Sequence, residues 1–187
     1  MSKLNPASIN GGGPEKRNRT GLYSTPPDCI DALLDFIKIP CNSIMEPCAG
    51  AGAVSNRLRE RGINVGYECD IDPQREGIEK RDFLTLDDRK GCDAIITNPP
   101  FALFEDFVRK GFALGIETQA YLLKVNVFSA MRRRNLFLEH TPSFKLDLQW
   151  RPDFLGGGSP TMDFCWVVWL NTKKADICRY GILKRPA

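Results

Sequence analysis

Histidine is nearly absent from this sequence, since His140 is the only one among 187 residues. It stands in the segment 139–142, which ends in Thr-Pro and is typical of a helix end at the surface, so a catalytic base beside a nucleophile is not expected. The seven cysteines are scattered and form no Cys-x-x-Cys pair. A zinc site is therefore not expected, and the thiols are predicted to be reduced, as in a cytoplasmic protein.

Long apolar runs are missing as well. No stretch approaches the roughly 18–20 apolar residues of a membrane span, and residues 1–6 lack the apolar core of a secretory signal. Hydrophobic residues make up 42% of the chain and charged residues 26%, which is usual for a globular protein. The sequence predicts a cytoplasmic protein with a sizeable core and no association with membranes.

A strong net charge is also absent. The formal charge is +3, and the first twenty residues alone carry four basic side chains and one acidic one. The rest of the chain is therefore neutral and lacks the basic footprint of a high-affinity nucleic-acid binder, so any such contact must come from a local patch. Residues 1–20 are predicted to be a disordered basic tail, either solvated or touching phosphate, and residues 21–187 to form one domain.

Helical and strand-like segments alternate along most of this domain. Apolar residues at helical spacing predict helices over 28–37, 54–61, 104–114 and 129–139, with Thr25 as a helix N-cap and a short helix within 72–77. Apolar and β-branched runs predict strands over 42–48, 63–70, 78–84, 92–97, 119–127, 144–150, 163–170 and 177–184. The alternation indicates an α/β fold with a mostly parallel, doubly wound sheet. The last strands lack intervening helices, which favours an antiparallel C-terminal edge.

A glycine-rich turn follows the first predicted strand. Gly50 and Gly52 form a Gly-x-Gly that lets the backbone bend tightly and lets a ligand approach it closely. Ser55 stands where a dinucleotide fingerprint has its third glycine, and no Gly-Lys-Ser/Thr of a P-loop follows. Glu46, just before the turn, disfavours a pyrophosphate and favours a cationic group.

Acidic residues end the next two predicted strands. Asp70 lies about twenty residues after the glycine turn, where a carboxylate can accept both hydroxyls of a ribose. Asp82 could accept the amino group of an adenine and Phe83 could pack on its ring, although both acids could also be capping or surface residues. These groups together describe a ligand with a ribose, an adenine and a positive charge but no phosphate. S-adenosyl-L-methionine fits this description, and a nicotinamide dinucleotide does not.

The segment Asn98-Pro99-Pro100-Phe101 directly follows a buried run that contains Ile95 and Ile96. The two prolines end the strand because neither can donate to a sheet ladder. The amide oxygen of the asparagine and the carbonyl of the first proline are then two acceptors beside an aromatic ring. This set suits a planar substrate that carries an amino group; the alternative is an ordinary strand-ending turn with a buried phenylalanine.

The segment 46–52, Glu-Pro-Cys-Ala-Gly-Ala-Gly, followed by Asn-Pro-Pro-Phe, resembles the S-adenosylmethionine-dependent amino methyltransferases. The chain is most similar to the adenine-N6 DNA methyltransferases, particularly small bacteriophage-type members, over roughly residues 19–170. The resemblance implies a single-domain Rossmann-like methyltransferase fold that binds S-adenosyl-L-methionine. It assigns the cofactor to Tyr23, Thr25, Pro26, Glu46, Cys48, Ala49, Gly50, Gly52, Asp70, Ile71, Asp82 and Phe83. It assigns the target amino group to the Asn98 amide and the Pro99 carbonyl, and the target base to Phe101.

The resemblance implies methyl transfer to the N6 amino group of adenine in DNA, on a base flipped out of the duplex. Phosphate contacts are expected from Lys124, Arg132, Arg133, Arg134 and Arg151, unless the arginine run is simply a solvated basic helix. The chain lacks a separate target-recognition domain, so sequence specificity is relaxed, depends on a few loop residues, or requires a partner. Adenine in RNA and a protein glutamine amide remain alternative substrates. A non-catalytic cofactor-binding or nucleic-acid-binding module is a further alternative, which the intact acceptor pair disfavours.

Overall fold

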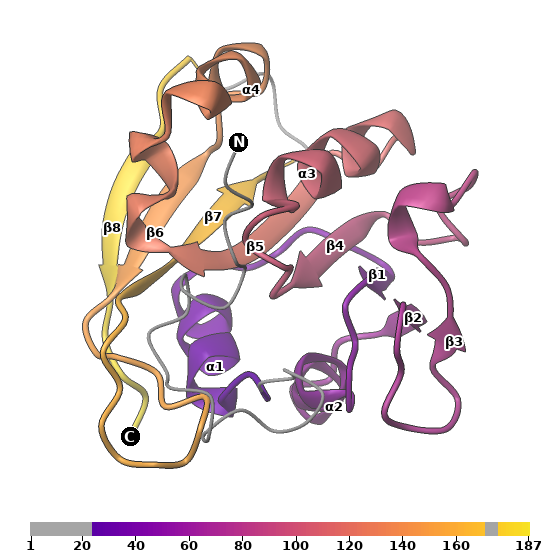
Figure 1. Ribbon diagram of the computed structural model, residues 1–187, viewed down its shortest axis with the longest axis horizontal. Coiled ribbons are helices and arrows are strands. Elements are labelled where there is room, and N and C mark those ends of the chain that lie inside the picture. The colour runs from indigo at the N-terminus through magenta and orange to yellow at the C-terminus, as the bar shows by residue number, and fades with distance from the viewer. Residues whose placement is uncertain (1–23, 171–175) are drawn as a thin grey trace, which may run out of the picture.

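A computed structural model describes residues 24–170 and 176–187, which form an eight-stranded sheet with helices on both faces (Figure 1). The strand order is β3-β2-β1-β4-β5-β7-β6-β8. The strands are β1 (Ile44–Glu46), β2 (Val65–Asp70), β3 (Glu79–Lys80), β4 (Ala94–Thr97), β5 (Thr118–Lys124), β6 (Phe144–Leu148), β7 (Phe164–Trp169) and β8 (Arg179–Leu183). The predicted tail 1–20 and the cofactor candidate Tyr23 lie outside the described residues.

The sheet direction agrees with the sequence prediction. Strands β3, β2, β1, β4 and β5 are parallel neighbours. Strand β7 runs antiparallel to both β5 and β6, while the outer strand β8 is parallel to β6. The mostly parallel α/β fold with antiparallel pairing in its C-terminal part is therefore confirmed.

Four α-helices of the described residues cover the sheet: α1 (Pro27–Phe36) and α2 (Ala53–Glu60) on one face, and α3 (Phe104–Ala113) and α4 (Arg134–Glu139) on the other (Figure 1). Each face has its own apolar core. Along β5, Ala120 and Leu122 pack toward α1 and α2, whereas Tyr121 and Leu123 pack toward α3 and α4. A strand covered on both sides reads as a continuous apolar run, which is why the central strands were recognisable from sequence.

Several predicted elements need correction. The short helix within 72–77 is wrong: this segment consists of bends and turns, and Gly77 has a φ of 87°. The strand over 78–84 shrinks to two residues, because the Asp82 side chain accepts from the Leu84 amide and starts the 3-10 helix η3 (Phe83–Thr85). The strand over 119–127 ends at Lys124, where the 3-10 helix η4 (Val125–Ser129) begins.

Two predicted helix starts also differ. The helix over 129–139 divides into the 3-10 helix η5 (Met131–Arg133) and α4. Thr25 is not the N-cap of α1; Pro26 takes that position and no side chain caps the helix. With a proline at the first helical position there is one amide fewer to cap, and the Thr25 hydroxyl instead accepts from the side chain of Asn98, which directly follows β4. Within residues 24–170 and 176–187, no helix is both long and apolar enough to cross a membrane.

Candidate active site

Three parallel neighbours, β2, β1 and β4, end at the same edge of the sheet. Strand β1 ends at Glu46, β2 ends at Asp70, and β4 is followed by Asn98. The carboxyl edge of such a sheet is where open α/β folds hold their ligands. The fold therefore gathers residues from three of the sequence motifs at one edge.

The turn between β1 and α2 is shaped by its glycines. Gly50 has a φ of 51° and Gly52 a φ of 85°, which side chains with a Cβ rarely adopt. The Gly50 amide donates to the Asp70 carboxylate (2.8 Å), and the Gly50 carbonyl accepts from Gln74 (2.9 Å). A Cβ at Gly52 would lie 2.7 Å from the Arg75 guanidinium, so Arg75 closes one side of the turn. The turn is thus tied to the end of β2.

Glu46 is completely buried. Its Oε1 accepts from the Thr97 hydroxyl (2.6 Å) and the Cys48 amide (3.2 Å), whereas its Oε2 is buried without a hydrogen-bond partner among the residues that the structure describes. Burial, assisted by the charges of Glu68 and Asp70, raises the pKa of Glu46 to about 8. The carboxyl group is therefore mostly neutral at pH 7, and a nearby cation would favour its ionised form.

Asp70 is also buried, and each of its oxygens accepts one backbone amide: Oδ2 from Gly50 and Oδ1 from Asp72 (2.8 Å). The next residue, Ile71, is 69% exposed, which places a large aliphatic side chain at the rim of this edge. Asp82 lies beyond β3, half-buried, and caps η3. The Phe83 ring is only 1% exposed and packs 4.9 Å from the Phe107 ring, so it belongs to the core beneath the site.

The Asn98 side chain contacts the start of α1. Its Nδ2 donates to the Thr25 hydroxyl (3.1 Å), although the two residues are 73 positions apart. This bond directs the amide nitrogen to the protein and leaves the amide oxygen as the atom that can accept from a substrate. Pro99 is buried and Pro100 is exposed, so the chain leaves the sheet within this segment.

Phe101 is half-buried and reaches both cores of the protein. Its ring centroid lies 5.9 Å from that of Phe164 at the start of β7, and Phe154 lies 4.7 Å from Phe164 in turn. The Lys124 ammonium stands over the Phe101 ring, 5.1 Å from its centroid, and burial lowers the pKa of this lysine. An aromatic cluster, Phe101–Phe154–Phe164, therefore adjoins Asn98, and its packing around Phe164 was not predicted from the sequence.

The predicted phosphate contacts differ in their surroundings. Arg132 and Arg134 are exposed and form no ion pair with any residue in the described part of the chain. Arg133 is half-buried and donates to two backbone carbonyls. Arg151 is paired with Asp163 (2.8 Å). The run 132–134 is therefore not a uniformly solvated basic helix.

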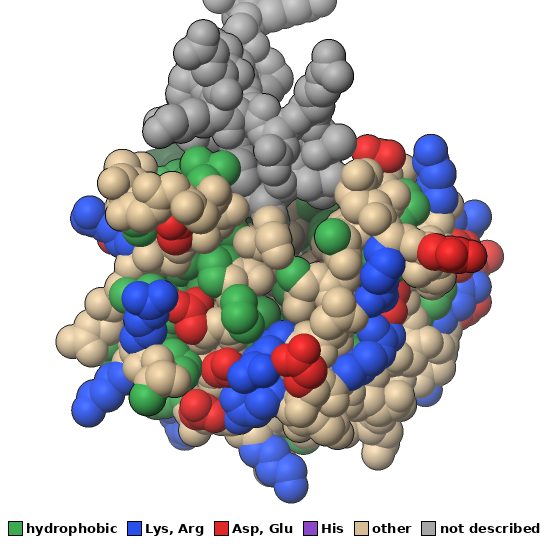
Figure 2. Space-filling view, turned by 90° about the horizontal axis from the view of Figure 1, so that it is seen from below, with side chains coloured by type: hydrophobic (Ala, Val, Ile, Leu, Met, Phe, Trp, Pro, Cys, Tyr) green, Lys and Arg blue, Asp and Glu red, His purple; other side chains and the backbone are tan. Residues whose placement is uncertain are grey.

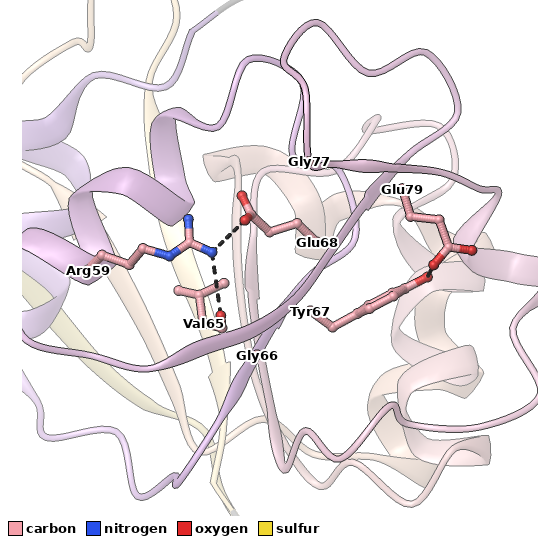
Figure 3. Close-up of a pocket in the computed structure, with 7 residues that line it drawn as sticks. All are labelled: Arg59, Val65, Gly66, Tyr67, Glu68, Gly77 and Glu79. Carbon is pink, nitrogen blue, oxygen red and sulfur yellow. Dashed lines mark hydrogen bonds and ion pairs between the residues drawn. The ribbon is translucent and has the colours of Figure 1, made fainter.

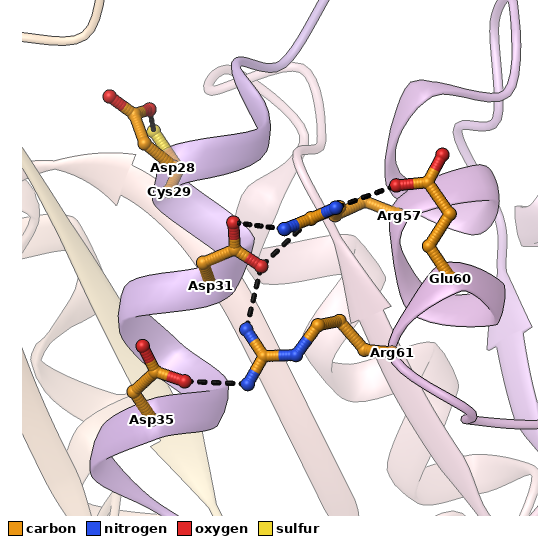
Figure 4. A network of polar contacts seen from close by, with 7 residues as sticks. All are labelled: Asp28, Cys29, Asp31, Asp35, Arg57, Glu60 and Arg61. Carbon is orange, nitrogen blue, oxygen red and sulfur yellow. Dashed lines mark hydrogen bonds and ion pairs between the residues drawn. The ribbon is translucent and has the colours of Figure 1, made fainter. Parts of the chain in front are cut away.

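An ionic network fixes α1 against α2 (Figure 4). Arg57 donates to both oxygens of Asp31 (2.8 and 2.6 Å), and Arg61 bridges Asp31 and Asp35 (2.7 and 2.5 Å). Although burial opposes ionisation, the bonds from these arginines lower the pKa of Asp31. Asp31 contacts Arg57, and Asp35, one turn further along α1, contacts Arg61, one turn further along the chain. The two helices therefore run in the same direction, and their N-termini lie at the same end. The network thereby holds Thr25 near the glycine turn.

A cavity of about 420 Å³ opens at those two N-termini, with Thr25, Ala53, Asn56 and Arg57 in its wall. Its lining also includes Asp31, Glu60 and the C-terminal residues Pro186 and Ala187, and among the predicted site residues that the structure describes only Thr25 belongs to it. In Figure 2, which views the molecule from the side of α1 and α2, basic and acidic side chains alternate, so this face presents no continuous basic patch.

A second hollow, of about 350 Å³, lies beside the amino-terminal half of β2 (Figure 3). The polar side chains that line this hollow bond to one another: Arg59 forms an ion pair with Glu68, and the Tyr67 hydroxyl donates to the Glu79 carboxylate (2.8 Å). It lies away from the carboxyl edge and contains none of the predicted site residues. In the described residues no group of three or more acidic, histidine or cysteine side chains could hold a metal ion.

Comparison with known proteins identifies the fold. No protein-family model matches the chain, and no curated protein matches its sequence. A putative class I S-adenosylmethionine-dependent methyltransferase from Listeria monocytogenes is similar in structure, with 15% identity, a TM-score of 0.60, and coverage of 92% of this chain and 68% of that one.

Two further solved structures are similar. A putative RNA methyltransferase from Pyrococcus horikoshii has 14% identity and a TM-score of 0.56, over 87% of this chain and 94% of that one. A modification subunit of a putative type I restriction enzyme from Vibrio vulnificus has 12% identity and a TM-score of 0.55, over 90% of this chain and 48% of that one. The chain therefore has the fold of the class I S-adenosylmethionine-dependent methyltransferases.

Proposed function

We propose that this protein transfers a methyl group from S-adenosyl-L-methionine to the exocyclic N6 amino group of adenine in DNA. The observation that carries the proposal is the meeting of Glu46, Asp70 and Asn98 at the carboxyl ends of three adjacent parallel strands. These residues supply a site for a cation, for a ribose and for an amino group. Each was expected from a separate motif, and the fold brings them to one edge.

The residues at this edge fit the cofactor. The buried Oε2 of Glu46, which has no hydrogen-bond partner in the described part of the chain, can accept from a cationic methionine end. Each oxygen of Asp70 accepts one backbone amide and retains a lone pair for a ribose hydroxyl. The exposed Ile71 offers an aliphatic surface to an adenine ring, and Asp82 can accept its amino group. When bound, the cofactor supplies a methyl group activated by a sulfonium.

The protein's own task is to make the substrate nitrogen a better nucleophile. The lone pair of an exocyclic amine is delocalised into the ring. Hydrogen bonds from its two N–H groups to the Asn98 Oδ1 and the Pro99 carbonyl would favour a tetrahedral nitrogen with a localised lone pair. The nitrogen would then gain the methyl group as the bond between that carbon and the sulfonium sulfur breaks and leaves a neutral thioether, and one proton of the nitrogen would pass to water. Positioning of this kind can lower a barrier by roughly 7–11 kcal/mol.

A duplex base must leave the stack to reach this edge. Stacking on Phe101 would return about 1–3 kcal/mol of that cost. Because Lys124 stands over the ring, the base either takes the other face of Phe101 or displaces the ammonium toward a phosphate. Arg132 and Arg134 are exposed and form no ion pair with residues 24–170 or 176–187, which suits phosphate contacts.

Adenine in RNA is the second candidate, favoured by the similarity in fold to a protein described as a putative RNA methyltransferase. A glutamine amide in a protein would present the same two N–H groups. The chain beyond residue 20 has no net charge, and the side of α1 and α2 shows no continuous basic patch in Figure 2. This charge distribution does not favour DNA over RNA or protein as the substrate.

The decisive experiment offers labelled S-adenosyl-L-methionine with unmethylated DNA, RNA and a protein extract in parallel. Label recovered as N6-methyladenine from DNA supports the proposal, while label only in RNA or protein keeps the chemistry and changes the substrate. Asn98→Ala should abolish transfer with cofactor affinity retained. Asn64→Ala is the matched control, because Asn64 is exposed and precedes β2 at the opposite edge of the sheet. Loss of cofactor binding in Asn98→Ala would make Asn98 structural.

A further inference from the structure

Arg133 differs from the arginines on either side of it. Arg132 and Arg134 are exposed, whereas Arg133 is turned inward. Its Nη1 donates to the Val127 carbonyl and its Nη2 to the Phe101 carbonyl, both at 3.1 Å. Its guanidinium carbon also lies 5.5 Å from the centroid of the Phe104 ring at the start of α3. One side chain thus contacts three segments around the candidate site.

The environment of this guanidinium is unfavourable for a cation. Burial, together with the charge of Arg132, lowers the pKa of Arg133, and Glu105 only partly offsets this effect. Two carbonyls and an aromatic face provide the compensation. A planar guanidinium can donate to two acceptors in different directions while stacking on a ring, which an ammonium group cannot do.

The segment from Asn98 to Phe101, whose last carbonyl accepts from Arg133, can form few backbone hydrogen bonds of its own. Pro99 and Pro100 have no amide hydrogen to donate, so the sheet ladder stops at Thr97. The Pro100 carbonyl accepts from Leu103 (2.9 Å), and the Phe101 carbonyl accepts from Arg133. The hydrogen bond from Arg133 to the Phe101 carbonyl therefore restrains the loop where the two prolines cannot donate a backbone hydrogen bond.

We propose that Arg133 is a positioning residue that holds the Asn98–Phe101 loop in its reactive geometry; this inference rests on the proposed methyl transfer. The three consecutive arginines then have two tasks. Arg133 fastens η5 to the loop, and Arg132 and Arg134 face outward where a polyanionic substrate would lie. Substrate held by the outer pair is thereby placed at a constant distance from the acceptor groups of the loop.

The kinetic test compares single substitutions along this run. Since a displacement of about 1 Å can cost about 100-fold in rate, Arg133→Ala should lower kcat by about 10- to 100-fold, with the KM for the cofactor within about twofold of wild type. Arg133→Lys should stay impaired, and millimolar guanidinium ion should partly restore Arg133→Ala but not Asn98→Ala. Arg132→Ala and Arg134→Ala should instead raise the KM for nucleic acid and lower the salt slope by about one each.

Two further measurements make the outcome decisive. Arg89→Ala, an exposed arginine in a distant loop, is the control for loss of positive charge. Hydrogen exchange of the Leu103 amide, which donates to the Pro100 carbonyl within this loop, should accelerate in Arg133→Ala and Arg133→Lys but not in Arg132→Ala. Unchanged exchange, or an unchanged kcat in Arg133→Ala, overturns the inference. If wild-type protein methylates no substrate, the proposed function fails, while the exchange measurement still decides whether Arg133 anchors the loop.

Discussion

Glu46→Gln should remove an unusual contribution to the dependence of stability on pH. The carboxyl group is fully buried and its pKa is raised to about 8, from an ordinary value near 4.5. Between these two values the folded protein binds more protons at Glu46 than the unfolded chain does. The free energy of unfolding must therefore fall as the pH rises through this window. At about 1.4 kcal/mol per pH unit, the loss approaches about 5 kcal/mol by pH 8.

Glutamine keeps the shape of the side chain and an acceptor for the Thr97 hydroxyl, but it does not titrate. Urea unfolding of both proteins at a series of pH values from 5 to 8 gives the free energy of unfolding at each pH. The difference between variant and wild type cancels the contribution of all other groups. Glu46→Gln should gain relative stability steadily with pH. A difference that does not vary with pH would refute a neutral, buried Glu46.

The same proton links Glu46 to the proposed cofactor. A cationic ligand beside Oε2 favours the carboxylate, so binding at pH 7 should release a proton. Calorimetry of S-adenosyl-L-methionine binding in two buffers of different ionisation enthalpy measures this release directly. Wild type should release close to one proton and bind more tightly as the pH rises toward 8, and Glu46→Gln should bind more weakly and release almost none. Binding by wild type without proton release would place the cation elsewhere.

Three further changes test other parts of the site. Asp70→Ala should weaken cofactor binding by about tenfold or more, since losing even one of the two charge-assisted hydrogen bonds to the ribose costs about 1.5–3 kcal/mol, and unchanged affinity in calorimetry would remove the ribose assignment. Phe101→Ala should weaken binding of the target strand by about 1–3 kcal/mol, measured by fluorescence titration with a base analogue at the target position, and Phe101→Tyr should restore it. Asp31→Asn should lower the free energy of unfolding by about 1–3 kcal/mol, whereas Asp35→Asn, at the exposed end of the network, should cost less than about 1 kcal/mol in the same urea assay.

Local signals in the sequence predicted the parts of the fold that depend on neighbouring residues. Ile95 and Ile96 indicate a buried strand and the following prolines end it, and β4 does end at Thr97. The apolar spacing over 104–114 predicts α3 to within one residue at its C-terminal end. In such cases the period of the side chains and the chemistry of the terminating residue determine the structure together.

Elements held by distant contacts could not be predicted in this way. The segment 72–77 is rich in residues found in helices and turns, but Gln74 bonds to Gly50 and Arg75 donates to Asn56 and Glu68 (2.5 and 2.6 Å). These bonds draw the segment across the glycine turn and prevent helix formation. The arginine run posed a similar problem, because three identical side chains in sequence carry no local sign of which one will be buried.

The candidate site combines both kinds of information. Residue type was enough to select Asn98, Glu46 and Asp70, because the chemistry of an acceptor or a carboxylate is a property of the side chain itself. The orientation of Asn98, however, depends on Thr25, and the position of Thr25 depends on the seating of α1. That seating is maintained by the ion pairs from Asp31 to Arg57 on α2 and to Arg61, which directly follows α2. A network with no contact to a substrate therefore lies within the chain of interactions that aims the acceptor amide.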